Sequence, residues 1–142
     1  MKEAAHGHFI IHRYPKLLLL KPLGHFNRSG IRHLATRMFE ALDHGIEQPW
    51  AYLEHLQNQP SITADGLDEL SVMYQGLEQR GCSRFVSVSD SRLSSMISQK
   101  CARQAGIKLC CYSCLEEAYE ALAEDPGIRA QWSDMEPVEY SG

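Results

Sequence analysis

The sequence predicts a single-domain α/β fold: a mixed five-stranded sheet whose helices lie mainly on one face. A length of 142 residues leaves room for one domain. Hydrophobic residues make up 44% of the chain and charged residues 23%, a globular composition that excludes wholesale disorder. Strand-like and helix-like segments follow one another in the order ββαβαβαβα, which indicates parallel strands joined by right-handed crossovers.

The first two strands are predicted to form an antiparallel hairpin. Residues 7–15 are rich in β-branched and aromatic side chains. Residues 16–23 contain four consecutive leucines, a run that is typical of a strand buried on both faces. Only Tyr14, Pro15 and Lys16 are available for a turn between the two strands, so they are most simply neighbours in the sheet.

The first helix follows a connecting loop at residues 24–30. Asn27 or Ser29 can cap its start, and Gly45 can end it in the left-handed conformation. Its apolar residues recur at helical spacing and form one stripe, which consists of Ile31, Leu34, Ala35, Met38, Phe39 and Leu42.

The rest of the domain continues this alternation. Further strands are predicted at residues 49–56, 83–89 and 107–112. The helices between and after them are predicted to run from an N-cap at Thr63 to Arg80, from Asp90 or Ser91 to Gly106, and from a capping box of Ser113 and Glu116.

We assign residues 1–127 to this domain and residues 128–142 to an acidic, aperiodic C-terminal tail. If the strands follow one another in space, the crossovers place every helix on the same face of the sheet. The other face would then be exposed or covered by a partner, which predicts a homodimer. The core is expected to contain Leu18, Leu20, Leu34, Leu70 and Val86.

Charge and cysteine content restrict the partners and the compartment. The net charge is −4, although residues 1–33 carry six Lys and Arg against one Glu, a local charge of +5. An acidic chain does not suit binding to the nucleic-acid backbone. No apolar run approaches the ~18 residues of a membrane span, and the N-terminus lacks the apolar stretch of a secretion signal. We therefore expect a cytoplasmic protein whose five cysteines are free thiols.

Several segments together carry a resemblance to a known family. They are the leucine-rich strand that ends in Gly24, residues 49–53 (PWAYL), residues 81–86 (GCSRFV) and the Glu117-Ala118 pair. Over about residues 7–125 the chain resembles the STAS-like domains, the family of sporulation-type anti-sigma-factor antagonists, and in particular their uncharacterised stand-alone bacterial relatives. The resemblance implies a small cytoplasmic regulatory or ligand-sensing module rather than an enzyme.

One departure from the family pattern concerns its regulatory switch. The antagonists carry Asp-Ser-Ser-Gly-Leu at the start of a helix, and the first Ser is phosphorylated. The matching stretch here is residues 63–67 (TADGL), with Ala64 at the position of that Ser. Ser61 and Thr63 lie nearby but out of register, so the resemblance implies a module without the usual phosphorylatable Ser.

The loop before the first helix is the candidate site for an anion or another ligand. It places Asn27, Arg28 and Ser29 at a helix N-terminus, where free backbone amides and the helix dipole favour an anion. The loop is not a phosphate-cradling P-loop, because its glycines are six apart and the Lys-Ser/Thr pair is missing. Plain capping of the helix is the alternative interpretation.

The cysteines and histidines are the candidates for a redox or metal site. Cys111 and Cys114 have redox spacing, but Cys111 would lie in a strand and only Cys114 at a helix start, where the dipole lowers a thiol pKa. Ordinary buried cysteines are the simpler interpretation. No second Cys pair completes a zinc site, and nothing fixes a third ligand beside His6, His8 and His12, so no metal is expected.

These observations predict a non-enzymatic regulatory or binding module without a cofactor. No nucleophile elbow indicates catalysis, and no Cys–His–Asp grouping can be inferred. The expected partner is a second copy of the chain, another protein, or a small anionic or apolar ligand. Two alternatives stay open: a thiol redox protein that uses Cys111 and Cys114, and a carrier of a small apolar ligand between the helices and the sheet.

Overall fold

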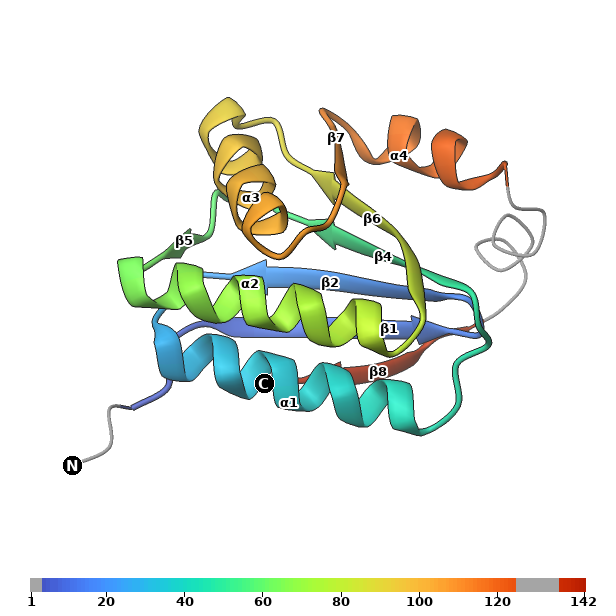
Figure 1. The fold of residues 1–142 in the computed structure, drawn as a ribbon, viewed down its shortest axis with the longest axis horizontal. Coiled ribbons are helices and arrows are strands. Elements are labelled where there is room, and N and C mark those ends of the chain that lie inside the picture. The colour runs from blue at the N-terminus through green and yellow to red at the C-terminus, as the bar shows by residue number, and fades with distance from the viewer. Residues whose placement is uncertain (1–3, 125–135) are drawn as a thin grey trace.

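A computed structural model describes residues 4–124 and 136–142 and confirms a mixed α/β fold (Figure 1). The strands are β1 (His8–Tyr14), β2 (Leu17–Leu23), β3 (His25–Phe26), β4 (Trp50–His55), β5 (Ser61–Ile62), β6 (Cys82–Val88), β7 (Leu109–Tyr112) and β8 (Val138–Ser141). The helices are α1 (Arg28–Asp43), α2 (Ala64–Gln79), α3 (Arg92–Gln104) and α4 (Leu115–Leu122).

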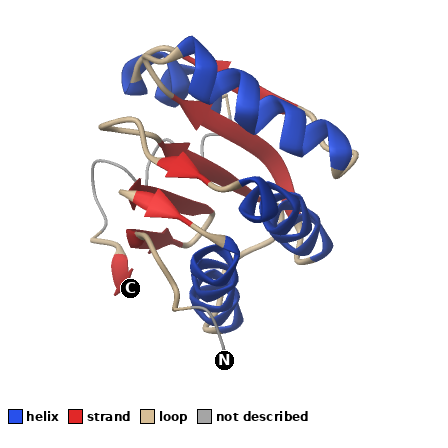
Figure 2. Ribbon diagram, turned by 90° about the vertical axis from the view of Figure 1, so that its left-hand side faces the viewer, coloured by secondary structure: helices blue, strands red, loops and turns tan. Residues whose placement is uncertain are grey.

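Within the described residues, the main sheet has six strands in the order β7-β6-β4-β2-β1-β8. The predicted hairpin is confirmed, because β1 and β2 pair antiparallel with Ile11 opposite Leu20. The strands β2, β4, β6 and β7 are parallel to one another, as the alternation of strands and helices predicts. Figure 2 shows the main sheet as one twisted layer with helices packed beside it.

The four leucines of β2 explain why the sheet has two cores. All four are buried. Leu18 and Leu20 pack in the core beneath α1, α2 and α3, whereas Leu17 and Leu19 pack in a second core with α4. Because successive side chains of a strand point to opposite faces, an uninterrupted apolar run is the pattern of a strand covered on both sides.

Four of the five residues expected in the core are buried: Leu18, Leu20, Leu34 and Val86. Leu70 is only partly buried, because it lines the cavity described below.

The expectation that every helix lies on one face of the sheet is wrong for α4, which packs Ala118 and Leu122 against the other face. The strand order gives the physical reason. The connections from β2 to β4, β6 and β7 run toward one edge, whereas the connection from β7 through α4 returns to β8 at the other edge. Since β8 points the same way as β7, a right-handed crossover in this reverse direction places its helix on the opposite face.

This position of α4 removes the reason for predicting a dimer. The face that would otherwise be bare is buried within a single chain, where Leu17, Leu53 and Val88 have exposed fractions of 0%, 0% and 2%. Self-association stays a prediction, but within the described residues no bare apolar sheet face supports it.

The prediction of five strands and a C-terminal tail is corrected by β8. Its residues, Val138–Ser141, pair antiparallel with β1, and Gly142 and Phe9 exchange two further backbone hydrogen bonds of 3.1 and 3.2 Å. Most side chains of β8 are exposed, so its stability depends on backbone pairing at a sheet edge and no apolar pattern marks it. The remaining part of the proposed tail, residues 128–135, lies outside the described residues.

The predicted caps are confirmed for three helices and wrong for the fourth. The side chains of Asn27, Thr63 and Ser91 each accept a hydrogen bond from a backbone N–H in the first turn of α1, α2 and α3. The capping box of Ser113 and Glu116 does not form. The N-cap of α4 is the next residue, Cys114, which moves Glu116 one position too close to the cap to reach back to it.

Two short strands that the sequence presents as loops position the candidate site. β3 and β5 pair in parallel, with Phe26 opposite Ile62. The pairing continues into the next residue, because the N–H of Thr63 donates to the carbonyl of Phe26 over 2.9 Å. Since Asn27 and Thr63 follow directly, this pair of strands brings the starts of α1 and α2 to the same end of the domain.

Candidate ligand-binding cavity

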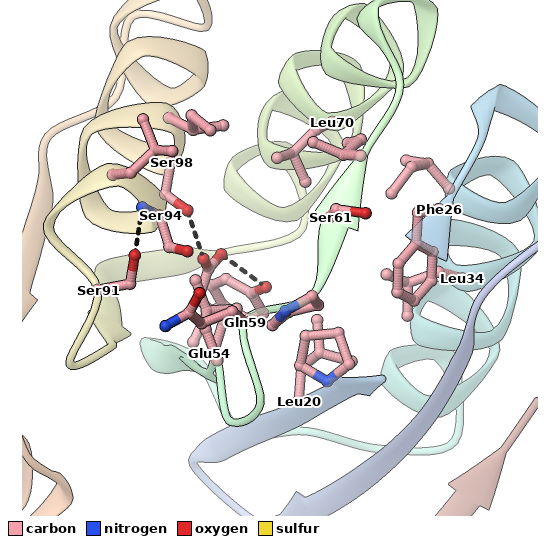
Figure 3. A pocket seen from close by; sticks show the side chains of 18 residues that line it. Leu20, Phe26, Leu34, Glu54, Gln59, Ser61, Leu70, Ser91, Ser94 and Ser98 are labelled. Carbon is pink, nitrogen blue, oxygen red and sulfur yellow. Dashed lines mark hydrogen bonds between the residues drawn. The ribbon is translucent and has the colours of Figure 1, made fainter. Parts of the chain in front are cut away.

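A cavity of about 290 Å³ lies between the main sheet and the helices α1, α2 and α3 (Figure 3). It is at the end of the domain where β2 and β4 finish, and the carboxyl ends of parallel strands are where open α/β sheets bind ligands. Its lining is mainly apolar and comes from several elements, including Leu20 of β2, Phe26 of β3, Leu34 of α1, Leu70 of α2 and Ile97 of α3.

The buried side chain of Glu54 lines this cavity (Figure 3). Glu54 is the second-last residue of β4, and its exposed fraction is 3%. Four hydroxyl groups donate to its two oxygens. Oε1 accepts from Tyr52 (3.1 Å) and Tyr74 (2.5 Å), and Oε2 accepts from Ser87 (3.0 Å) and Ser98 (2.9 Å).

The four donors come from four different elements, so one carboxylate connects the sheet to two helices. Tyr52 is two residues earlier on β4 and therefore points to the same face as Glu54. Tyr74 comes from α2, Ser87 from the neighbouring strand β6, and Ser98 from α3. An ionised carboxylate has about four lone-pair positions, and each hydroxyl can fill one of them.

Burial and hydrogen bonding act in opposite directions on Glu54. Burial raises the pKa of its carboxyl above the ordinary 4.5, and the hydrogen bonds from the four hydroxyls, that of Tyr74 first, oppose this rise. Burial also raises the pKa of Tyr52 and of Tyr74 well above 10.0. Among the described residues that line the cavity there is no Lys, Arg or His, so no side chain there supplies a positive charge.

Ser91, the N-cap of α3, and Ser94 within α3 add polar groups to the lining of the cavity. The Ser91 hydroxyl oxygen accepts from the backbone N–H of Ser94 over 3.2 Å, which caps the helix. Ser94 is one turn before Ser98 and therefore faces the same way. Within the described residues, the Ser94 hydroxyl makes no hydrogen bond, so it is available to a ligand.

The three residues predicted as an anion site lie at the start of α1, and none of them lines the cavity. Asn27 is buried; its side chain accepts from the backbone N–H groups of Gly30 and His6 and donates to the carbonyl of Ala4. Residues 4–6 therefore lie across this helix end. Arg28 is exposed and its Nε lies 3.4 Å from Oε1 of Glu69, and Ser29 is half-buried. Anion binding at these residues stays a prediction.

The cysteines give the redox hypothesis no support. Cys111 packs on the core side that α3 covers, its thiol donates to the carbonyl of Ser95 over 3.9 Å, and burial raises its pKa. Cys114 is exposed at the start of α4, which covers the other face. A raised pKa disfavours the thiolate that redox chemistry requires.

The described residues give no sign of a metal site or of a membrane-spanning helix. Within the described residues, no three His, Cys, Asp or Glu side chains gather so that they could hold a metal ion. None of the helices in this part of the chain has the length and apolar character needed to cross a bilayer.

Sequence reasoning missed Glu54. The available signal was a single acidic residue inside the apolar segment PWAYLEHL, at a spacing of two from Tyr52. An acid in a strand that is otherwise buried is rare unless it has partners. Three of its four partners, Tyr74, Ser87 and Ser98, lie 20 to 44 residues away along the chain, so the sequence pattern does not reveal them.

Comparison with solved structures finds a protein with a similar fold. The chain is similar to an uncharacterised protein of the DUF3478 family with a SpoIIAA-like fold from Shewanella loihica PV-4. The TM-score is 0.58 and the sequence identity 15%, over 86% of this chain and 98% of that one. The fold is SpoIIAA-like. This confirms, for the fold, the resemblance to STAS-like domains. No protein-family model matches the sequence, and comparison with curated proteins gives no significant match.

Proposed function

We propose that this chain is a non-enzymatic binding module that holds a small, mainly apolar ligand in the cavity beside Glu54. The observation that carries the proposal is the cavity itself, about 290 Å³ in volume and mainly apolar in lining. Ligand sites are typically concave, largely apolar and equipped with a few polar groups that fix orientation. At about 30 Å³ for each water-sized unit, the cavity has room for roughly ten non-hydrogen atoms.

The residues around the cavity support binding more than catalysis. Among the described residues that line it, Glu54 is the only carboxylate, and none is Cys, His or Lys. General acid–base catalysis needs a group that reaches the proton of a substrate. Both oxygens of Glu54 are instead engaged by hydroxyls of the protein.

The module would have a regulatory role if binding of the ligand in the cavity changes the surface formed by the surrounding helices. The cavity is lined by α1, α2 and α3, so a ligand contacts three helices that also form the outer surface of this face (Figure 1). The phosphorylation switch of the sporulation-type antagonists is not part of the proposal, because Ala64 begins α2 at the matching position. A cytoplasmic location and a protein partner stay predictions from the sequence.

Native mass spectrometry of protein purified directly from cells tests the proposal, because it reports a bound small molecule and the oligomeric state together. In parallel, octan-1-ol, which has nine non-hydrogen atoms, should bind the purified chain one to one in isothermal titration calorimetry.

The matched pair of variants is Ser94→Phe and Met96→Phe. Ser94 lines the cavity, whereas Met96 is exposed on the same helix. Ser94→Phe should abolish octan-1-ol binding and Met96→Phe should preserve it, with circular dichroism unchanged in both. Equal binding by the two variants would place the ligand elsewhere and refute the proposal.

A further inference from the structure

The described residues that line the cavity include one acidic side chain and no basic one. The buried Glu54 lines the cavity, and the described lining residues contain no basic side chain to balance its charge. A buried carboxylate without a counter-charge is unfavourable, because four hydroxyl dipoles replace its hydration but do not cancel its charge. A ligand that brings a positive charge would supply the interaction that the protein omits.

We propose that the cavity selects an apolar ligand that carries a protonated amine, and that Glu54 is the residue that determines this selectivity. The inference rests on the proposed function, because it specifies the chemical class of ligand for the same cavity. The apolar part of the ligand would pack against the side chains of Leu20, Leu34 and Leu70. The ammonium would lie at the carboxylate end.

The surroundings of Glu54 provide hydrogen-bond acceptors for an ammonium group. A serine hydroxyl accepts as well as donates, and the hydroxyl of Ser94 is unused within the described residues. Tyr52 and Ser98 both line the cavity and both donate to Glu54. An ammonium that displaces one of these two donors forms a direct, charge-assisted hydrogen bond to the carboxylate.

Within the described residues, the titratable groups that interact electrostatically with Glu54 do not compete for this role. The groups around it are Tyr52 on β4, Tyr74 on α2, Cys101 on α3 and Cys111 on β7. Burial raises the pKa of all four, so each stays neutral at neutral pH. Glu54 is therefore the source of negative charge that a bound ligand meets.

The same geometry disfavours the commonest apolar anions. A fatty-acid carboxylate would place a second negative charge beside Glu54, and like charges in one site oppose ionisation of both. A long-chain alcohol can hydrogen-bond with the serines but gains nothing from the charge. The expected order of affinity is therefore amine, then alcohol, then carboxylate.

Three ligands with the same eight-carbon chain test this order by isothermal titration calorimetry: octylamine, octan-1-ol and octanoate. Octylamine should bind the wild-type chain at least about tenfold more tightly than octan-1-ol, and octanoate should bind more weakly than the alcohol. Equal affinities for the amine and the alcohol would overturn this inference and leave the proposed function standing. Failure of all three compounds to bind would overturn both.

Glu54→Gln removes the charge and keeps the shape, and Glu120→Gln is the matched control. Glu120 is exposed on α4, on the far side of the sheet from the cavity. Glu54→Gln should abolish the preference for octylamine while octan-1-ol still binds, and Glu120→Gln should retain the preference. Persistence of the preference in Glu54→Gln would overturn the inference.

A measurement on the wild-type chain covers the case in which Glu54→Gln does not fold. An alkylammonium resembles the Lys side chain and stays charged at acidic pH. Glu54 becomes protonated as the pH falls through its raised pKa. The octylamine preference should therefore weaken as the pH falls toward about 4, where circular dichroism checks that the chain is folded. A preference that does not change with pH would overturn the inference.

Discussion

Removal of the Tyr74 hydroxyl should lower the free energy of unfolding by about 1.5–3 kcal/mol, the range for a hydrogen bond to a charged group. Tyr74 is fully buried, and its hydroxyl donates to Oε1 of Glu54 over 2.5 Å. Tyr74→Phe keeps the ring, whose centroid lies 6.1 Å from those of Tyr52 and Phe85 in edge-on contacts. The substitution therefore isolates the hydrogen bond from the aromatic packing.

Urea unfolding at neutral pH, followed by circular dichroism, measures this change. Tyr112→Phe is the control, because the Tyr112 hydroxyl makes no hydrogen bond within the described residues and its loss should change stability by less than about 0.5 kcal/mol. If Tyr74→Phe also changes the unfolding free energy by less than about 0.5 kcal/mol, the buried carboxylate does not depend on this donor and our account of the cluster is wrong.

Three further predictions follow from burial. Leu34→Ala should cost about 2–5 kcal/mol in urea unfolding, because Leu34 is buried; a cost under about 1 kcal/mol would contradict its place in the core. Because the pKa of Glu54 is raised above 4.5, the stability from its protonation is present below that pH and lost as the pH rises through the folded-state pKa. The stability of the wild type relative to Glu54→Gln should therefore fall across this window, and a flat or rising difference would contradict the raised pKa. A thiol reagent should modify exposed Cys114 before Cys111, whose pKa burial raises; the reverse order would revive the redox hypothesis.

The part of the fold that the sequence predicts is the part set by short-range chemistry. Asn27, Thr63 and Ser91 cap helices because a short polar side chain can reach an N–H two or three residues ahead. The leucines of β2 show burial on both faces because side chains alternate along one strand. Each of these inferences needs information from fewer than ten neighbouring residues.

The parts that sequence reasoning missed depend on residues far apart in the chain. Val138–Ser141 becomes a strand because β1 offers a free edge more than 120 residues earlier, and its exposed side chains give no apolar pattern. The face that α4 covers is decided by where β8 completes the sheet. The site is missed for the same reason, since Glu54 meets Ser98 across 44 residues.

The hydrogen-bonded cluster around Glu54 is energetically unfavourable compared with an apolar core. Burial of a carboxylate costs several kcal/mol, and apolar replacements of similar volume are often equally stable or more stable. Stability alone therefore does not account for an acid at this position. Glu54 borders a mainly apolar cavity, and under our proposal its single charge discriminates among ligands of equal size. The search for the natural ligand should therefore begin with the charge of the candidate molecules.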